Sequence, residues 1–256
     1  MRSSARRSRA ASRSRRRGRR PSGLLVSCEH GGNGVPPEYA PLFAGARRVL
    51  ESHRGMDFGA RDVALAFGAR LGVTPAIGTV TRLVVDLNRS PHHRTVFSEY
   101  TRGLSREQKS AVLDAHYRPY RTAVEGLVER TVRSGAFALH VSAHSFTPEL
   151  HGKVRNCDVG LLYDPRSESE RRFIEAWHAA LAVHAPALRV RRNYPYRGVS
   201  DSLVTHLRRL HGQRTYAGVE LEVNQKHVGT PGWHALVATL TDALEAAVQA
   251  TAGSLR

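Results

Sequence analysis

Cysteine, tryptophan and methionine are scarce in this chain of 256 residues, which contains two of each. The two cysteines, Cys28 and Cys157, are too few for a disulfide framework. A reducing compartment is the simpler interpretation, so we predict a cytoplasmic protein. The cysteines also lack the spacing of a zinc knuckle. No apolar run approaches the roughly 18 residues of a membrane span, so we expect no membrane partner.

Acidic residues are absent from residues 1–22, which contain ten arginines and almost no apolar side chain. This segment carries +10 of the net charge of +17 and leaves +7 for residues 23–256. A segment of this composition cannot bury enough apolar surface to fold, so we predict a disordered, Arg-rich tail. It could bind nucleic acid or another polyanion non-specifically through counterion release. The alternatives are an extension from a misplaced start codon and a transit-like peptide.

Residues 23–256 show strand-like and helix-like patterns in alternation. This alternation predicts a single α/β domain with a mixed, mainly parallel sheet and helices on both faces. Several apolar runs are nearly continuous, which is typical of strands covered on both sides. We predict strands over residues 24–28, 76–80, 83–87, 137–143, 159–163 and 217–223. We predict helices over residues 58–71, 106–133, 168–183, 201–210 and 233–250.

Helix ends are marked by polar residues and glycine. Ser105 is expected to cap the helix over 106–133, with Gln108 completing a capping box. Pro119 could bend this helix, and Gly135 fits its end. Ser200 is the expected cap of the helix that begins at residue 201.

Polar side chains gather where four of the predicted strands end. In open α/β sheets, ligands bind outside the carboxyl ends of the strands. We therefore expect the polar residues at these four ends to share a site. They are Glu29, His30, Asp86, Asn88, Arg89, His144, Ser145, Glu220, Glu222 and Asn224.

His30 and His144 are the best candidates for metal ligands, because each ends an apolar strand with carboxylates nearby. A catalytic zinc takes about three protein ligands and keeps one position open for water. The third ligand could be Asp57, just before a predicted helix, or Glu29. His140 lies within a buried strand and is expected to be packed or hydrogen-bonded instead.

Glu220 and Glu222 alternate with apolar residues in the strand over 217–223. A period of two places both carboxylates on one face of the sheet. A buried carboxylate with a raised pKa would suit a general base that deprotonates metal-bound water. The alternative is the exposed polar face of an edge strand.

Arg82, Asn88 and Arg89 are candidates for binding an anion, since the planar fork of arginine matches a carboxylate. Asp86 could instead neutralise either arginine in a structural ion pair.

Three further residues are candidates for substrate binding: Ser145, Asn193 and Tyr196. Ser145 directly follows His144. The other two belong to the aromatic loop over 193–198, which could line a pocket or simply pack as a turn.

These motifs together resemble the N-formylglutamate amidohydrolase family over roughly residues 24–245. The matching segments are Glu29-His30-Gly31-Gly32 with Val35-Pro36, Asp57, Asp86-Leu87-Asn88-Arg89-Ser90, Tyr117-Arg118-Pro119-Tyr120, Ser142-Ala143-His144-Ser145-Phe146, Asn193-Tyr194-Pro195-Tyr196-Arg197-Gly198 and Glu220-Leu221-Glu222-Val223-Asn224. That family is distantly similar to zinc carboxypeptidases and aspartoacylase. The resemblance therefore implies a zinc-exopeptidase-like hydrolase fold.

The resemblance also implies roles for individual residues. His30 and His144 would be zinc ligands, and Glu222 would be the general acid/base, with Glu220 as the fallback. Asn88 and Arg89 would bind a carboxylate or polarise the scissile carbonyl.

One departure concerns the acidic zinc ligand. The carboxypeptidase-like pattern His-x-x-Glu reads His30-Gly31-Gly32-Asn33 here, and asparagine is a poor zinc ligand. The acidic ligand must then come from elsewhere. We expect Asp57, and Glu29 after it.

We accordingly predict a metal-dependent amidohydrolase, with Zn²⁺, that acts on an N-acyl amino acid. The leading reaction is the hydrolysis of N-formyl-L-glutamate to formate and L-glutamate, with Arg89 or Arg82 holding the substrate carboxylate or the developing oxyanion. Two alternatives remain: a small-peptide or cell-wall-fragment amidase on the same scaffold, and a nucleic-acid-associated protein that acts through residues 1–22.

Overall fold

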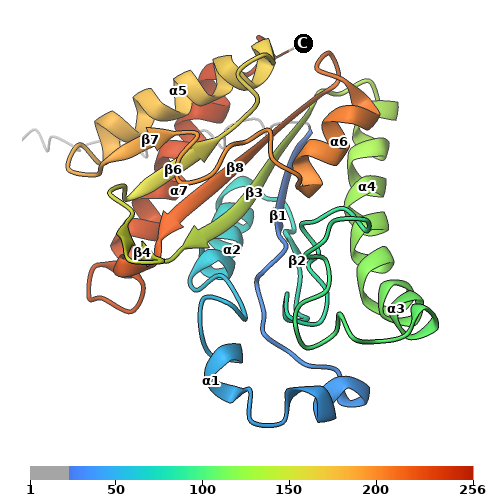
Figure 1. Cartoon of the computed structure of the whole chain (residues 1–256). Coiled ribbons are helices and arrows are strands. Elements are labelled where there is room, and N and C mark those ends of the chain that lie inside the picture. Colours follow the sequence, from blue (N-terminus) through green and yellow to red (C-terminus); the bar gives the residue numbers. More distant parts are fainter. Residues whose placement is uncertain (1–22, 256) are drawn as a thin grey trace, which may run out of the picture.

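A six-stranded sheet forms the centre of the computed structural model, which describes residues 23–255 (Figure 1). The strand order is β2-β1-β3-β8-β6-β7, and β6 against β8 is the antiparallel pair. The bounds are β1 Leu24–Cys28, β2 Ala76–Ile77, β3 Ala138–Phe146, β6 Val159–Leu162, β7 Val190–Arg192 and β8 Tyr216–Asn224. The prediction of one α/β domain with a mixed, mainly parallel sheet is confirmed.

Helices cover both faces of this sheet, as predicted (Figure 1). One face carries α2 (Ala60–Leu71), α5 (Glu168–His184) and α7 (Trp233–Thr251). The other face carries α4 (Arg118–Arg133) and α6 (Leu203–His211). The smaller elements are η1 Pro37–Phe43, α1 Arg47–Leu50, α3 Arg106–Val112, η2 Leu113–Tyr117, β4 Glu149–Leu150, β5 Lys153–Val154 and η3 Gln225–His227.

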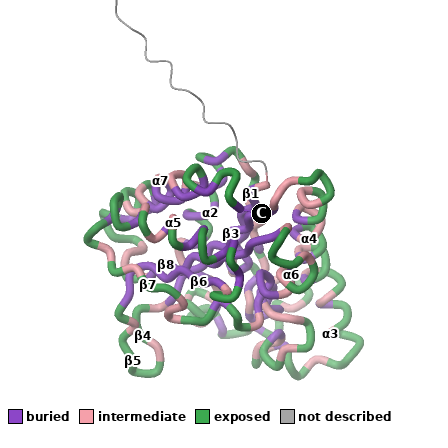
Figure 2. Tube along the Cα trace, turned by 90° about the horizontal axis from the view of Figure 1, so that it is seen from above, coloured by how far each residue is buried: buried purple, intermediate pink, exposed green. Residues whose placement is uncertain are grey.

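Side chains of the central strands alternate between an apolar face and a polar face. Val141 and Ala143 of β3, like Val219 and Leu221 of β8, belong to the core beneath α2, α5 and α7. The residues between them point to the opposite face, because side chains in a strand alternate with a period of two. Every residue of β3 and β8 is buried, and Figure 2 shows the buried residues gathered along these strands. The polar face is therefore enclosed as well, and it supplies the polar residues of the candidate site.

The predicted strand over residues 83–87 is wrong. Its apolar side chains are buried, but they pack in a separate cluster formed by loops and short helices between residues 35 and 120. The backbone turns here because side chains bond to it locally: Thr81 Oγ1 accepts from Leu83 N at 3.3 Å, and Asp86 Oδ1 accepts from Asn88 N at 3.0 Å. Such local bonds compete with a strand ladder.

The helix predicted over 106–133 is present as three consecutive segments, α3, the π-helical turn η2 and α4. Ser105 caps it as predicted, and Gln108 completes the capping box. The π turn ends just before Pro119, whose missing N–H would leave a gap in a regular α-helical ladder. Gly135, with a φ of 78°, follows the end of α4, as predicted.

Two further details differ from the sequence-based expectation. Helix α6 begins at Leu203, and its cap is Ser202, whose Oγ accepts from Thr205 N at 3.2 Å. The prediction of Ser200 as the cap is therefore wrong. Short elements such as β7 and the β4–β5 hairpin were not predicted, because two or three residues show no periodic pattern.

Two predictions concern the membrane and the Arg-rich segment. Within residues 23–255, no helix combines the length and the apolar character that crossing a bilayer demands. The predicted tail, residues 1–22, lies outside the described residues.

Candidate active site

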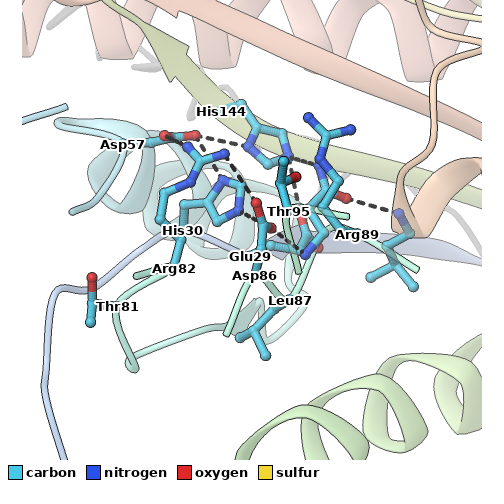
Figure 3. A network of polar contacts seen from close by, with 12 residues as sticks. Glu29, His30, Asp57, Thr81, Arg82, Asp86, Leu87, Arg89, Thr95 and His144 are labelled. Carbon is cyan, nitrogen blue, oxygen red and sulfur yellow. Dashed lines mark hydrogen bonds and ion pairs between the residues drawn. The ribbon is translucent and has the colours of Figure 1, made fainter. Parts of the chain in front are cut away.

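Most of the polar residues predicted from the sequence come together at the carboxyl ends of the central strands. Asn224 is the exception, because it borders neither cavity of the site and its Nδ2 donates to the carbonyl of Cys157 at 2.8 Å. His30 follows β1, His144 lies near the end of β3, and Glu222 lies near the end of β8. Asp57 and Asp86 reach the same place from loops. Figure 3 shows His30, His144 and Arg82 surrounding Asp57. The topology explains this convergence, because β1, β3 and β8 are parallel neighbours.

His30, Asp57 and His144 form a group that could hold a metal ion. One donor atom from each lies within 4.8 Å of the other two. Asp57 Oδ2 is 2.9 Å from His144 Nδ1 and 3.3 Å from His30 Nδ1. Two imidazole nitrogens and one carboxylate oxygen are the donor set of many catalytic zinc sites. The donor chemistry therefore fits the zinc ion expected from the sequence.

Each imidazole of this group has a second carboxylate behind it. His30 Nε2 is 2.7 Å from Asp86 Oδ1, and His144 Nε2 is 3.0 Å from Glu29 Oε2. A carboxylate that accepts from Nε2–H keeps the proton on that nitrogen and leaves the Nδ1 lone pair for a metal. The geometry thus favours Asp57 over Glu29 as the acidic ligand, because Glu29 lies at the other nitrogen of His144.

The buried charges of the site hold one another ionised. Burial opposes the ionisation of Asp57, but His30, Arg82 and His144 outweigh it and keep the pKa of this carboxyl well below its usual range. At His144, burial by itself lowers the pKa. Hydrogen bonds to Asp57 and Glu29 outweigh this effect and raise the pKa of His144 well above its ordinary value. A proton on His144 thus partly balances the carboxylates, and a bound cation would perform the same neutralisation.

Glu222 is the exception, because its carboxylate makes no hydrogen bond or ion pair with any residue that the structure describes. The residue is buried, and its Oε2 makes no hydrogen bond within residues 23–255. Burial, together with the negative charges of Asp57 and Glu220, raises the pKa of Glu222 to about 8, although His144 and Arg82 act in the opposite direction. A buried carboxyl with a free oxygen and a raised pKa is what a general base at neutral pH requires.

Glu220 and Glu222 lie on one face, as predicted, and border the same cavity. The alternative of an exposed face on an edge strand is wrong, because β8 lies between β3 and β6.

The donor group and Glu222 border a cavity of about 460 Å³. A second cavity, of about 430 Å³, adjoins it. The two have five residues in common: Asp57, Arg82, Arg89, Ser145 and Tyr196. Four of these five were predicted to contact substrate, and Asp57 was predicted to bind the metal.

The two arginines differ in how far their guanidinium groups are already occupied. Arg82 Nη1 is 3.0 Å from Asp57 Oδ1 and Arg82 Nη2 is 3.4 Å from Asp86 Oδ2, so this side chain forms the structural ion pair considered above. Among the described residues, the side chain of Arg89 donates one hydrogen bond, to the carbonyl of Asp201. Arg89 therefore has more donors left for a ligand.

Asn88 and Asn193, two of the predicted substrate-binding residues, accept hydrogen bonds from the backbone of neighbouring segments. Asn88 borders the first cavity, and its Oδ1 accepts from Leu203 N at 2.8 Å, which ties it to the start of α6. Asn193 borders neither cavity. Its Oδ1 accepts from Tyr163 N at 3.1 Å and from Gly198 N at 3.0 Å, so it shapes the loop over 193–198.

Several contacts of the site were not foreseen. Asp86 was expected in the site and considered as a partner of arginine, but its contact with His30 was not predicted. Ser142 Oγ donates to Glu29 Oε2 at 2.5 Å and Tyr120 Oη to Glu29 Oε1 at 3.1 Å. No local pattern could have revealed these contacts, since the partners are 56, 113 and 91 residues apart.

His140 is buried and hydrogen-bonded, as predicted. Its Nε2 is 2.7 Å from Ser27 Oγ and its Nδ1 is 2.8 Å from Tyr216 Oη. Burial lowers its pKa to about 4 from an ordinary value of 6.5, and the charges of Arg208 and His144 act in the same direction while Glu29 opposes them. The folded protein therefore holds this ring neutral.

Acid is expected to destabilise the fold through His140. Because the pKa is lower in the folded than in the unfolded state, the unfolded chain takes up a proton first as the pH falls through 6.5 toward 4. His140→Gln removes this proton uptake. The wild-type free energy of unfolding should therefore fall more than that of the variant, by up to about 3 kcal/mol. Urea unfolding at both ends of this pH range measures the difference, and parallel curves would contradict it.

The sequence match to a known family completes the description of the site. The family model of N-formylglutamate amidohydrolases matches residues 22–228. The chain belongs to this family. The matched range contains every site residue from Glu29 to Glu222, and the family resemblance drawn from the sequence is confirmed.

Solved structures support the same assignment of fold for this N-formylglutamate amidohydrolase family member. A protein from Agrobacterium tumefaciens is 28% identical, with a TM-score of 0.77 over 90% of this chain and 91% of that one. An N-formylglutamate amidohydrolase from Ralstonia eutropha is 18% identical, with a TM-score of 0.68 over 90% of this chain and 94% of that one. A search of curated proteins gave no match. Because the family model matches most of the chain, the chain is a hydrolase of the N-formylglutamate amidohydrolase type.

Proposed function

We propose that this protein is a metal-dependent amidohydrolase of N-acyl amino acids, with N-formyl-L-glutamate as the leading substrate. The products would be formate and L-glutamate. The observation that carries the proposal is the Oε2 of Glu222, which makes no hydrogen bond with any described residue; Glu222 borders the same cavity as the His30–Asp57–His144 group. Membership in the family supports amide hydrolysis.

A Zn²⁺ ion would be held by Nδ1 of His30, Nδ1 of His144 and Oδ2 of Asp57. When bound, such an ion polarises the acyl carbonyl and lowers the pKa of a coordinated water toward about 7. Asp86 and Glu29 orient the two imidazoles from behind.

Glu222 is assigned the proton transfers. Its carboxylate takes a proton from the attacking water, whose oxygen bonds to the acyl carbon. The protonated carboxyl then delivers this proton to the amide nitrogen as the C–N bond breaks, so that the acyl group leaves as a carboxylic acid and the amino acid as a free amine. A carboxyl whose pKa is raised to about 8 can perform both steps near neutral pH.

Arg89 is assigned to bind the negatively charged group of the substrate or the developing oxyanion. Its side chain borders both cavities, and its remaining N–H groups are not taken by a carboxylate within residues 23–255. Arg82, which already bridges Asp57 and Asp86, is assigned a supporting role.

The proposal is tested by measuring amine release from N-formyl-L-glutamate before and after dialysis against a chelator, and again after Zn²⁺ is added back. We expect turnover to disappear on chelation and to return with the metal. Hydrolysis that survives complete metal removal would contradict metal dependence. Release of amine from muramoyl peptides, with none from any N-formyl amino acid, would favour the cell-wall-fragment amidase.

The same assay separates the enzyme from a nucleic-acid-associated protein. A chain that begins at Ser22 should keep its full turnover, whereas salt-sensitive binding to DNA should weaken, because ten arginines are removed. Turnover that depends on residues 1–22 would contradict the assignment of the reaction to residues 23–256. The cytoplasmic location stays a prediction.

A further inference from the structure

The helical segment that runs from α3 through η2 into α4 turns one face toward the interior. The buried residues of this segment are, in order, Val112, Tyr117, Arg121, Val124 and Val128. The later ones are three or four positions apart, as on one face of an α-helix, whereas Val112 and Tyr117 are five apart. The π turn accommodates this larger spacing, because its N–H groups bond five residues back, as Arg118 N does to the carbonyl of Leu113. It therefore brings Tyr117 onto the buried face.

This buried face is apolar along most of α4 and polar at its start. Val124 and Val128 pack in an apolar cluster with residues of β1 and α6. One turn earlier, the same face presents two phenol groups and a guanidinium, from Tyr117, Tyr120 and Arg121. Side chains three and four positions apart on a helix are neighbours. Polar groups in such a place need partners, and theirs lie in the candidate active site.

Two of these side chains hold the backbone of Arg89. Tyr117 Oη donates to the carbonyl of Arg89 at 2.7 Å. Arg121 Nη1 lies 3.4 Å from the same oxygen and 3.3 Å from the carbonyl of Leu87. A buried guanidinium is costly, and the ion pair of Arg121 with Glu125 is long, at 3.8 Å. The shorter contacts of Arg121 are thus with the loop that carries Arg89, whose side chain borders both cavities.

The third side chain, Tyr120, reaches the metal-donor group. Its Oη is 3.1 Å from Glu29 Oε1, and Glu29 Oε2 is 3.0 Å from His144 Nε2. Burial opposes the ionisation of Glu29, but hydrogen bonds with His144 and Ser142 outweigh it and keep the pKa of this carboxyl well below its usual range. Tyr120 Oη is also 3.2 Å from the carbonyl of Ala76. The ionised carboxylate is the stronger acceptor of the two.

We propose that the face formed by Tyr117, Tyr120 and Arg121 is a positioning element with two separate effects. Tyr117, together with Arg121, fixes the backbone of Arg89 for anion binding. Tyr120 fixes His144 for metal binding, by way of the carboxylate behind that imidazole. The inference rests on the proposed function, because that function assigns the anion to Arg89 and the metal to His144. One helix face serves both tasks through different partners, so the two effects can be separated.

Removal of one hydroxyl at a time separates them. Tyr117→Phe should raise the dissociation constant of L-glutamate, measured by calorimetry on the zinc-saturated protein, about 3- to 10-fold and leave zinc affinity unchanged. Tyr120→Phe should lower zinc affinity, measured by competition with a chelating dye, about 3- to 10-fold and leave the binding of L-glutamate to the zinc-saturated protein unchanged. Tyr100→Phe is the matched control, because the Tyr100 ring stacks on Phe43 and its hydroxyl makes no hydrogen bond with a described residue. Both constants of this control should equal those of the wild type.

A merely structural role would not produce this crossed pattern, since general loosening of the helix would weaken both ligands together. The proposal is overturned if Tyr117→Phe or Tyr120→Phe equals the wild type in its own measurement, or if both variants weaken both ligands alike. Neither titration requires turnover. A wild type that binds zinc and L-glutamate but hydrolyses no N-acyl amino acid would refute the proposed function, while the two titrations would still decide on this helix face.

Discussion

Replacing Glu222 by Gln is expected to lower kcat for N-formyl-L-glutamate by about 10²- to 10⁴-fold while the bound metal stays in place. Glutamine keeps the shape of the side chain but can neither take a proton from water nor deliver one to the leaving nitrogen. The fold should survive, because Oε2 of Glu222 makes no hydrogen bond within residues 23–255 that the change could remove. Turnover and zinc content, measured on the same preparation, check both halves of the expectation.

Glu220→Gln is the matched control, because Glu220 lies two residues away on the same face of β8 and borders the same cavity. Its variant should keep most of the activity. An inactive Glu220→Gln beside an active Glu222→Gln would reverse the two assignments. Full activity in both variants would move the general base to another residue.

Loss of either imidazole from the donor group is expected to abolish stoichiometric metal binding. The wild type should bind about one Zn²⁺ per chain, and His30→Ala and His144→Ala should each lose most of it, because two donors rarely hold zinc tightly. Hydrolysis should fall with the metal content. Metal analysis after identical purification provides the measurement, and full occupancy in both variants with an intact fold would contradict the assignment.

Two other sets of variants make this test sharper. Glu29→Gln and Asp86→Asn change the carboxylates behind the imidazoles, so each should weaken metal affinity by about 10- to 100-fold without removing a ligand. His92→Ala changes an exposed histidine of a loop and should bind metal as the wild type does. A loss for Glu29→Gln as complete as that for His144→Ala would indicate that Glu29 is itself a ligand.

The regular parts of the fold were predictable from the sequence because their patterns are local. Residues of β8 alternate between apolar and polar, and this alternation alone placed Glu220 and Glu222 on one face. The cap at Ser105 and the end of the helix at Gly135 were predictable for the same reason. Each depends on residues within a turn of one another, so no knowledge of the tertiary structure was required.

Residues 83–87 show where this reasoning stops. Their apolar run indicates burial correctly, but burial in a strand and burial in a turn look alike in a sequence. The outcome was decided by side-chain bonds from Thr81 and Asp86 to the backbone and by a second apolar cluster. The partnership of Asp86 with His30 was hidden for a similar reason, since it joins segments that meet only when the chain has folded.

Glu222 lies on a strand that is hydrogen-bonded on both sides, whereas Asp57 and Asp86 lie on irregular segments. A strand in the middle of a sheet exchanges its amide hydrogens only when the whole domain opens, while loops open at a smaller cost in free energy. Glu222, and His144 on the neighbouring strand β3, are therefore attached to the slowest-exchanging part of the molecule. The donor Asp57, and Asp86 behind His30, are attached to parts that open more easily. In mild denaturant, the donor group should come apart while the sheet, with Glu222 on it, is still folded.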